Sequence, residues 1–322
     1  MVKLTITKNE SSQRLDRFLK KYLKNAPLSH IYKLIRKDVK VNGKRAGIDT
    51  VLEEGDELSL YVSQEKLDEY LKPKKMPAAK RQFGIAYEDE NLIIVEKPFG
   101  LLTHGDAAEK KNTLANQVCG YLQQKGEYNP GRERTFVPSP VNRLDRNTTG
   151  LVLFGKTSDA LQLLNKMIRE RGRISKQYLT IVAGKLDKPL TLADRMEKDE
   201  ARNLVKVLPE DAEEGKLMQT IARPLRTKGG FTLVEVELIT GRTHQIRAHL
   251  SQAGFPIIGD VKYGNRRTNE TVKKRFGLTT QLLHAEKLVF RKSEPPLAYL
   301  EGKVVRAQLP PSFERIKKEL FD

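Results

Sequence analysis

The sequence predicts a protein of mixed helices and strands, and the period of its apolar residues is the main reason. Apolar side chains recur at helical spacing over residues 15–23, whereas residues 58–62 and 231–239 alternate as strands. Asn42–Gly43 is a turn pair typical of a two-residue hairpin, and the polar residues 88–91 separate two further apolar runs. Helices and hairpins therefore both contribute to the predicted fold.

A stretch of charged residues and prolines divides the chain into two domains. Residues 64–82 include Pro73 and Pro77 and few large apolar side chains, which is typical of a linker. We therefore expect a small domain at 1–63 and a larger one at 83–322. A chain of 322 residues is long enough for both domains and for a well-buried core.

The charge of the chain indicates a polyanionic partner. Lys and Arg outnumber Asp and Glu by 59 to 41, which gives a net charge of +18 and a sequence pI of about 9.7. RNA, DNA and an anionic membrane surface all carry the complementary charge. No apolar run approaches the roughly 20 residues of a transmembrane helix, so we expect no membrane association. Residues 1–8 lack the apolar segment of a signal peptide, and Cys119 is the only cysteine, which together favour the cytoplasm.

The basic charge is concentrated in the small domain. Residues 14–45 contain eleven Lys or Arg against two acidic residues, Asp16 and Asp38. Their spacing predicts two helices with apolar inner faces, followed by a strand that enters the Asn42–Gly43 turn. Charge of one sign either solvates a helix pair or binds phosphates, and its extent over both helices and the turn favours RNA binding. The candidate RNA-binding residues are Arg14, Arg17, Lys33, Arg36, Lys37 and Lys44.

The larger domain shows the same two periods. Its expected elements are a hairpin over 85–95, helices over 113–122 and 158–168, strands over 176–184 and 231–239, and a short helix that ends near Gly254. In contrast, residues 190–228 are polar and have little periodicity. We expect surface loops or short edge strands there.

Asp145 is the candidate catalytic residue. It lies in a polar turn that runs directly into the apolar strand 150–154. Arg143 and Arg146 place positive charge on either side of the carboxylate, and the small residues 148–150 allow close approach of a ligand. A carboxylate in a pocket can act as a nucleophile. An Asp before a strand more often makes only local hydrogen bonds, so the residue alone leaves both interpretations open.

A second polar segment, 240–250, joins the strand 231–239 to the following helix. Its Arg242 and the first helix amides are expected at one end of a sheet, which is a natural anion site. His244 and His249 are five residues apart, whereas zinc-binding helices favour a spacing of four together with further ligands. No third ligand is apparent in the sequence, so we expect no metal site.

Four motifs in this order resemble those of the RluA-type pseudouridine synthases, which isomerise uridine in RNA. The motifs are Lys-Pro-Phe-Gly-Leu at 97–101, Arg-Leu-Asp-Arg-Asn-Thr-Thr-Gly-Leu at 143–151, Lys-Gln-Tyr at 176–178 and Thr-Gly-Arg-Thr-His-Gln-Ile-Arg at 240–247. Segments 259–264 and 282–285 continue the resemblance, which covers nearly all of residues 83–312. One departure is Asn142, where the family commonly has histidine.

The resemblance implies an α+β fold in which helices flank a mixed, mainly antiparallel sheet, with the active site in a cleft. In that family the motif aspartate attacks the nucleoside, a tyrosine lies against the flipped base and helps to handle the C5 proton, and an arginine pairs with the aspartate. A further arginine fills the space that the nucleotide leaves, and an apolar residue forms one wall of the base pocket. These residues correspond here to Asp145, Tyr178, Arg242, Arg143 and Leu283, in that order.

The small domain, expected to be α/β, resembles the RNA-binding domain named after ribosomal protein S four. An appended domain of this kind is typical of relatives that modify large-subunit ribosomal RNA, so we expect that substrate ahead of transfer RNA. A non-catalytic, ribosome-associated RNA-binding factor is another class, as is a glycosidase, which usually needs two carboxylates about 5–9.5 Å apart. The isomerisation oxidises nothing and imports no group, so no cofactor is implied. We expect a monomer with RNA as its partner.

Overall fold

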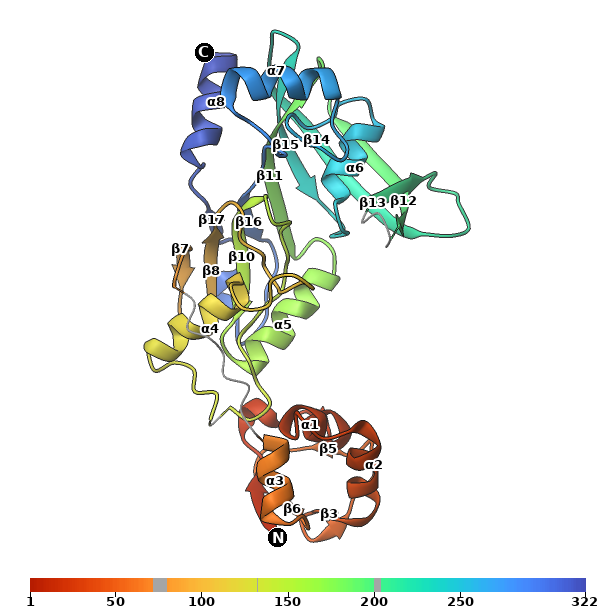
Figure 1. Cartoon of the computed structure of the whole chain (residues 1–322), viewed down its shortest axis with the longest axis vertical. Helices are drawn as coiled ribbons and strands as arrows, with labels where there is room; N and C mark the ends of the chain where they lie inside the picture. The colour runs from red at the N-terminus through yellow and green to blue at the C-terminus, as the bar shows by residue number, and fades with distance from the viewer. Residues whose placement is uncertain (72–79, 132, 200–203) are drawn as a thin grey trace.

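The computed structural model describes residues 1–71, 80–131, 133–199 and 204–322. A small N-terminal domain adjoins one end of an elongated larger domain (Figure 1). None of the described helices is long and apolar enough to cross a membrane.

The small domain combines two sheets with helices on its surface. Its four-stranded sheet has the order β1-β6-β3-β4, and β2 pairs with β5. Its elements are β1 (Val2–Thr5), η1 (Lys8–Glu10), β2 (Gln13–Arg14), α1 (Leu15–Tyr22), α2 (Leu28–Lys37), β3 (Val39–Val41), β4 (Lys44–Arg45), β5 (Val51–Leu52), β6 (Glu57–Leu60) and α3 (Gln64–Leu71). The predicted hairpin turn between β3 and β4 is confirmed, because Asn42 and Gly43 have φ values of 50° and 76°.

The linker prediction is wrong for residues 64–71, which form helix α3. Leu67 and Tyr70 of this helix are buried in the core of the small domain, and the Tyr70 hydroxyl bonds to His30 Nδ1 at 2.9 Å. The surrounding charged residues conceal these two apolar contacts in the sequence. Residues 72–79 of the predicted linker lie outside the described residues.

The larger domain is built on one long sheet of order β13-β12-β14-β15-β11-β16-β10-β8-β7, to which β9 and β17 are added at β10 and β16. Its strands are β7 (Gly84–Glu88), β8 (Leu92–Lys97), β9 (Ser139–Pro140), β10 (Thr149–Gly155), β11 (Ile174–Ala183), β12 (Leu190–Asp199), β13 (Leu204–Leu208), β14 (Lys216–Lys228), β15 (Phe231–Leu238), β16 (Leu283–Phe290) and β17 (Val304–Arg306). β10 and β16 run parallel, and the other pairings in the described part of this sheet are antiparallel. The expected mixed, mainly antiparallel sheet is confirmed.

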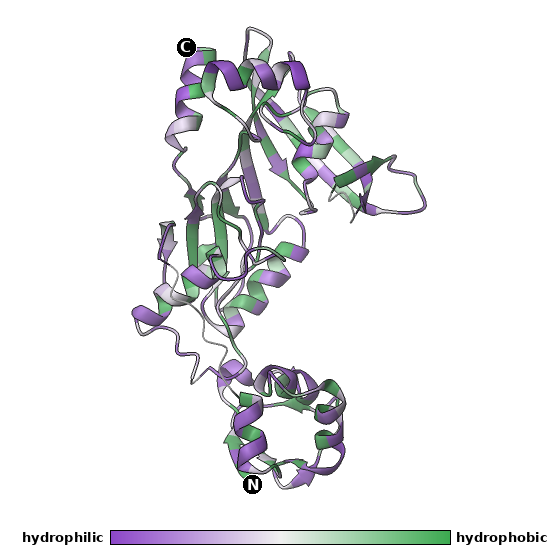
Figure 2. Ribbon diagram, in the orientation of Figure 1, coloured by the Kyte–Doolittle hydropathy of each residue, from purple (hydrophilic) through white to green (hydrophobic). Residues whose placement is uncertain are grey.

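Helices cover this sheet and close its ends. They are α4 (Leu114–Gln124), α5 (Ser158–Arg169), α6 (Gln245–Gln252), α7 (Arg266–Phe276), the short η2 (Ala298–Leu300) and α8 (Pro311–Phe321). The central strands are apolar along most of their length (Figure 2). In β10, Val152 and Phe154 pack on the core that includes Val118 of α4, whereas Leu151 and Leu153 pack on the core that includes Leu164 of α5. The sheet is therefore buried on both faces where β10 lies.

The prediction of loops or short edge strands over 190–228 holds for β13, a short strand at the edge of the sheet, but it is wrong for β12 and β14, which are long strands. Met218, Thr220 and Ala222 of β14 form its fully buried face. Threonine and alanine give a weak hydrophobic signal, and a bulge between Pro224 and Arg226 breaks the alternation. Every second residue of β14 is therefore buried over 218–222, but these buried residues are not all strongly hydrophobic.

The two domains meet through polar side chains. Glu10 of η1 is 1% exposed and accepts a hydrogen bond from Arg134 Nε at 2.7 Å. Asn9 donates to Glu133 at 3.1 Å, and Gln13 donates to Thr135 at 3.1 Å. The loop 133–135 of the larger domain thus contacts η1 and β2 of the small domain.

Candidate active site

Three central strands bring separate sequence motifs together. Gly150 of β10 is in register with Ala285 of β16, and Ala285 is in register with Tyr178 of β11. Gly150 has a φ of 108°, and a Cβ at this position would lie 2.2 Å from the Ala285 carbonyl oxygen. Only glycine permits this approach. The Asp145 turn, which precedes β10, is consequently held beside Tyr178 and Leu283.

The turn that carries Asp145 is fixed on both sides by buried groups. Thr103 Oγ1 donates to the Leu144 carbonyl at 3.0 Å and accepts from the Leu144 amide at 3.2 Å. Lys97 Nζ donates to the Arg146 carbonyl at 2.9 Å and also to the Pro98 and Leu101 carbonyls. Burial lowers the pKa of Lys97 to about 7, although the negative charge of Asp145 opposes this shift. The motif lysine therefore joins two loops of the pocket.

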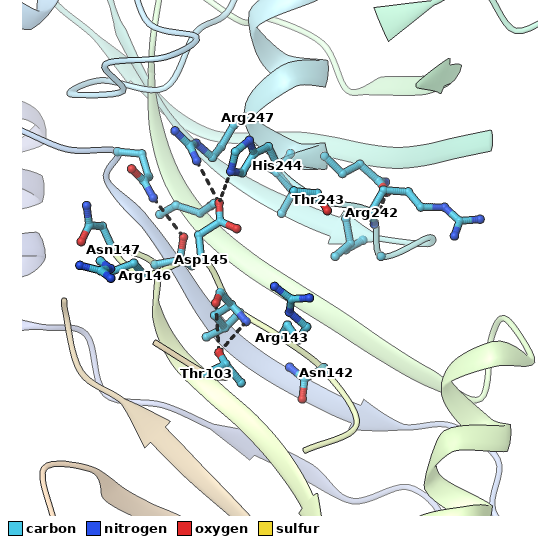
Figure 3. Close-up of a pocket in the computed structure, with 18 of the residues that line it drawn as sticks. Thr103, Asn142, Arg143, Asp145, Arg146, Asn147, Arg242, Thr243, His244 and Arg247 are labelled. Carbon is cyan, nitrogen blue, oxygen red and sulfur yellow. Dashed lines mark hydrogen bonds and ion pairs between the residues drawn. The ribbon is translucent and has the colours of Figure 1, made fainter. Parts of the chain in front are cut away.

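Asp145 presents a partly open carboxylate to the pocket. Its side chain is 29% exposed, and its Oδ2 accepts a hydrogen bond from Arg247 Nη1 at 3.0 Å. His244 Nε2 lies 3.9 Å from the same oxygen. Figure 3 shows Arg247 and His244 converging on Asp145 from the side of α6.

The predicted pair between Asp145 and Arg242 is wrong, because Arg247 occupies that place. Arg242 is exposed, and its Nε lies 3.4 Å from the Leu217 carbonyl, to which it donates. Its side chain points away from Asp145 in Figure 3. Arg242 precedes the tight turn at His244, which has a φ of 53°, whereas Arg247 lies in the first turn of α6 and faces the pocket. Both arginines belong to the motif at 240–247, so the sequence alone did not show which of them contacts Asp145.

A second carboxylate, Asp260, holds Arg247 from behind. Asp260 is 0% exposed and accepts from Arg247 Nε at 2.7 Å and from Nη2 at 2.9 Å. Its Oδ1 also accepts from the amides of Lys262 and Tyr263. One edge of the guanidinium is thus bound by Asp260, which leaves Nη1 for Asp145.

Two glycines allow the tight turn around Asp260. A Cβ at Gly259 would lie 2.3 Å from the Thr280 carbonyl oxygen, and one at Gly264 would lie 2.1 Å from the Asp260 carbonyl oxygen. Burial would lower the pKa of Arg247, but the hydrogen bond and charge of Asp260, together with Asp145, raise it overall. Burial would raise the pKa of Asp260, but Arg247 and the turn amides lower it overall. Arg247 and Asp260 therefore remain a charged pair over the working pH range.

The two histidines of the motif have separate partners. His244 Nδ1 bonds to the Tyr263 hydroxyl at 3.0 Å, and burial lowers the pKa of His244 against the opposing charge of Asp145. His249 is buried and bonds through Nδ1 to Thr220 Oγ1 at 2.8 Å. In the described ranges, no group of three or more His, Cys, Asp or Glu side chains is arranged to hold a metal ion.

The pocket around Asp145 has a volume of about 670 Å³, which suits a nucleotide-sized ligand. Tyr178 and Leu283 line it, and both are buried. Burial, with a smaller effect of the Asp145 charge, raises the pKa of Tyr178, so its hydroxyl stays protonated at neutral pH. The structure thus brings these two predicted residues into the pocket of Asp145.

Arg143 and Asn142 also line the pocket. Arg143 is exposed, and its guanidinium has no hydrogen-bond or ion-pair partner among the residues that the structure describes. Asn142 accepts from the Leu153 amide at 2.9 Å and donates to the Leu151 carbonyl at 3.2 Å. In place of the usual histidine, this asparagine therefore pairs both of its polar side-chain atoms with the backbone in the middle of strand β10.

The six predicted RNA-binding residues lie at the surface of the small domain. Arg14 pairs with Asp16 at 3.0 Å, whereas the other five have no hydrogen-bond or ion-pair partner within the described ranges. These five are Arg17, Lys33, Arg36, Lys37 and Lys44. Their charges are available to a ligand.

Comparisons with known proteins identify one family. The family model described as RNA pseudouridylate synthase matches residues 91–252. "Ribosomal large subunit pseudouridine synthase C" of Vibrio cholerae is 33% identical over 293 residues, which cover 89% of this chain and 88% of the relative. The Escherichia coli protein of the same name is 34% identical over 298 residues, with coverage of 89% and 88%.

Two solved human structures are similar in fold. "RNA Pseudouridylate Synthase Domain Containing 4" has a TM-score of 0.55 at 22% identity and covers 73% of this chain and 93% of its own. "RNA Pseudouridylate Synthase Domain Containing 1" has a TM-score of 0.52 at 20% identity, with coverage of 76% and 96%. These similarities concern the fold alone.

Proposed function

Because this chain belongs to the RNA pseudouridylate synthase family, we propose that it isomerises specific uridines of large-subunit ribosomal RNA, with Asp145 as the nucleophile. The names of the bacterial relatives support this substrate ahead of transfer RNA. The single observation that carries the nucleophile is the half-open Asp145 carboxylate, held at 3.0 Å by the buried Arg247. A non-catalytic RNA-binding factor would have no use for this arrangement.

The reaction needs only acid–base and nucleophilic groups. The N1–C1′ bond of uridine breaks, the base turns, and C5 bonds to C1′; the proton on C5 leaves and N1 gains one. No electron is gained or lost. Asp145 opens this route, either by attack at C1′ or by assisting formation of a glycal, and Arg247 orients its carboxylate throughout.

Tyr178, Leu283 and Arg143 position the base. The ring of Tyr178 and the side chain of Leu283 give the uracil two apolar walls, while the protonated Tyr178 hydroxyl lies close enough to Asp145 to feel its charge. A base must leave its stack to enter the pocket, which costs a few kcal/mol. The unpartnered guanidinium of Arg143 can occupy the space that the base leaves.

The small domain supplies affinity for RNA in this proposal, and its exposed cations are the contacts. Such an enzyme works where ribosomes are assembled, in the cytoplasm.

The nucleophile is tested by Asp145→Asn, which keeps the shape of the side chain and removes its charge. We expect pseudouridine formation to fall by a factor of about 1,000 or more, with folding and RNA binding retained. Asp187→Asn, a surface substitution of the same chemistry, should leave turnover unchanged. Mass-spectrometric detection of pseudouridine beside a thermal melt measures both effects. Appreciable turnover by folded Asp145→Asn would contradict the assignment.

The substrate is tested by mapping pseudouridines in total RNA from cells with and without the protein. Positions in large-subunit ribosomal RNA should lose the modification when the protein is absent. Losses confined to transfer RNA would replace the proposed substrate but leave the reaction intact.

A further inference from the structure

Lys176 is a buried cation on the pocket side of strand β11. Side chains two residues apart in a strand lie on the same face, so Lys176 shares a face with Tyr178. Both line the pocket around Asp145. Lys176 is 7% exposed, so nearly all of its side chain is shielded from water.

The ammonium of Lys176 has no partner among the residues that the structure describes. Three lysines of the described chain are buried, and the other two are fully satisfied. Lys97 donates to three carbonyls, and Lys156 pairs with Glu88 and Glu127. Lys176 has neither a carboxylate nor a carbonyl within hydrogen-bonding distance. The Nζ atom is not itself among the fully buried polar atoms that lack a partner, so it is open to the pocket, where an anion can reach it.

The position of Lys176 indicates which part of a nucleotide it meets. A Cβ at Gly241 would lie 3.5 Å from Lys176 Nζ, so the ammonium sits beside the loop that carries Arg242. Burial lowers the pKa of Lys176 to about 8. A second cation, Arg242, follows Gly241 in the same loop.

We propose that Lys176 binds a phosphodiester of the RNA beside the target uridine, at a subsite next to Gly241. This inference rests on the proposed function, because it assumes that RNA enters the pocket. Phosphate oxygens are the anions that RNA brings, and a lysine ammonium binds them as a point charge. When the RNA backbone binds in the pocket, its phosphate therefore supplies the negative charge that Lys176 lacks in the free protein.

The test uses Lys176→Met, which removes the charge and keeps the length of the apolar stem. RNA binding is measured in the Asp145→Asn background, so that no turnover complicates the affinity. We expect a roughly tenfold or greater loss of affinity and a log–log salt slope that is about 0.7 smaller. The matched control is Lys156→Met, which removes a buried lysine outside the pocket and should leave affinity and slope unchanged.

A second measurement identifies the phosphate without changing the protein. Each phosphodiester near the target uridine is replaced in turn by an uncharged methylphosphonate. At one position, the methylphosphonate should weaken RNA binding by the unmodified protein. The same methylphosphonate should not weaken binding by the Lys176→Met variant, because the contact is already lost. Lys176→Gln, which also removes the charge but keeps a polar end, takes the place of Lys176→Met in this comparison if Lys176→Met fails to fold.

The outcomes separate the two proposals. An unchanged affinity and slope for folded Lys176→Met would overturn the phosphate subsite, as would a loss of turnover at constant affinity, which would assign Lys176 to the base or to the chemical step. Equal losses at every methylphosphonate position in both proteins would overturn it too. Failure of the unmodified chain to form pseudouridine at all would instead contradict the proposed function.

Discussion

At the scale of the residue, Arg247 lies between two carboxylates that differ in burial and in the nitrogens that they bind. Asp260 is fully buried and binds two nitrogens of the guanidinium, whereas Asp145 is partly open and binds the third. Because the guanidinium is planar, fixing one edge also fixes the direction in which Nη1 points. Asp260 therefore positions Arg247 against Asp145, the proposed nucleophile.

We predict that Asp260→Asn lowers kcat more than it changes KM. The amide keeps the volume but loses the charge that holds Arg247, and a small displacement of a catalytic group costs roughly 10- to 100-fold in rate. KM should stay within about twofold, because cations elsewhere supply most of the affinity for RNA. Steady-state kinetics on RNA, beside a thermal melt, measures both quantities.

The control for this prediction is Glu237→Gln. Glu237 is also buried and accepts hydrogen bonds from Ser175 at 2.8 Å and Arg291 at 2.7 Å, but it does not line the pocket. Both substitutions should lower stability, whereas only Asp260→Asn should lower kcat. A normal kcat for folded Asp260→Asn would remove Asp260 from the site.

Lys176 gives a pH dependence of stability whose sign follows from its lowered pKa. Folding shifts this pKa from 10.5 to about 8, so below pH 8 the lysine is protonated in both states and its destabilising effect is complete. Between about pH 8 and 10.5 only the unfolded chain binds the proton, and stability rises with pH. Lys176→Met should therefore be more stable than the unmodified protein, by on the order of 3 kcal/mol at pH 7. Denaturant titrations from pH 7 to 10 should show the gap closing, and a gap that widens would contradict the assignment.

At the scale of the element, the sequence predicted those strands and helices whose apolar period is strong. β15 and α5 appear close to the predicted residues. β14 was missed because its buried face is built from Met218, Thr220 and Ala222, and α7 because only Val272 and Phe276 anchor it. Regular burial does not require strongly hydrophobic side chains when neighbouring strands supply the hydrogen bonds.

The site shows the same division between pattern and geometry. The motif letters led to Asp145, Tyr178 and Leu283, and the structure places all three in one pocket. They did not distinguish Arg242 from Arg247, because that choice depends on the left-handed turn at His244 and on where α6 begins. In the sequence, Asp260 was only a carboxylate between Gly259 and Gly264, and nothing there predicted its partner. Its contact with Arg247 depends on the close backbone approaches at Gly259 and Gly264.

At the scale of the whole molecule, the small domain is joined to the larger one by a buried ion pair. Glu10 and Arg134 connect η1 to the loop 133–135, and Asn9 accepts from the amide of Ser158 at the start of α5 at 3.3 Å. The exposed cations of α1 and α2 are therefore held at one end of the molecule (Figure 1), and α8 lies at the other. RNA that is bound by both domains must span the distance between them.

We predict that the small domain contributes affinity and not chemistry. Lys33→Gln combined with Lys37→Gln removes two exposed charges of α2, and each lost phosphate contact should reduce the log–log salt slope by about 0.7–0.9. The rate at saturating RNA should not change, because every group around Asp145 lies in the larger domain. Lys317→Gln combined with Lys318→Gln in α8 is the matched control, with the same change in charge at the opposite end of the molecule. Equal slopes for the two variants would show that only overall charge matters, and a lower saturating rate for the α2 variant would mean that the small domain acts in the chemical step.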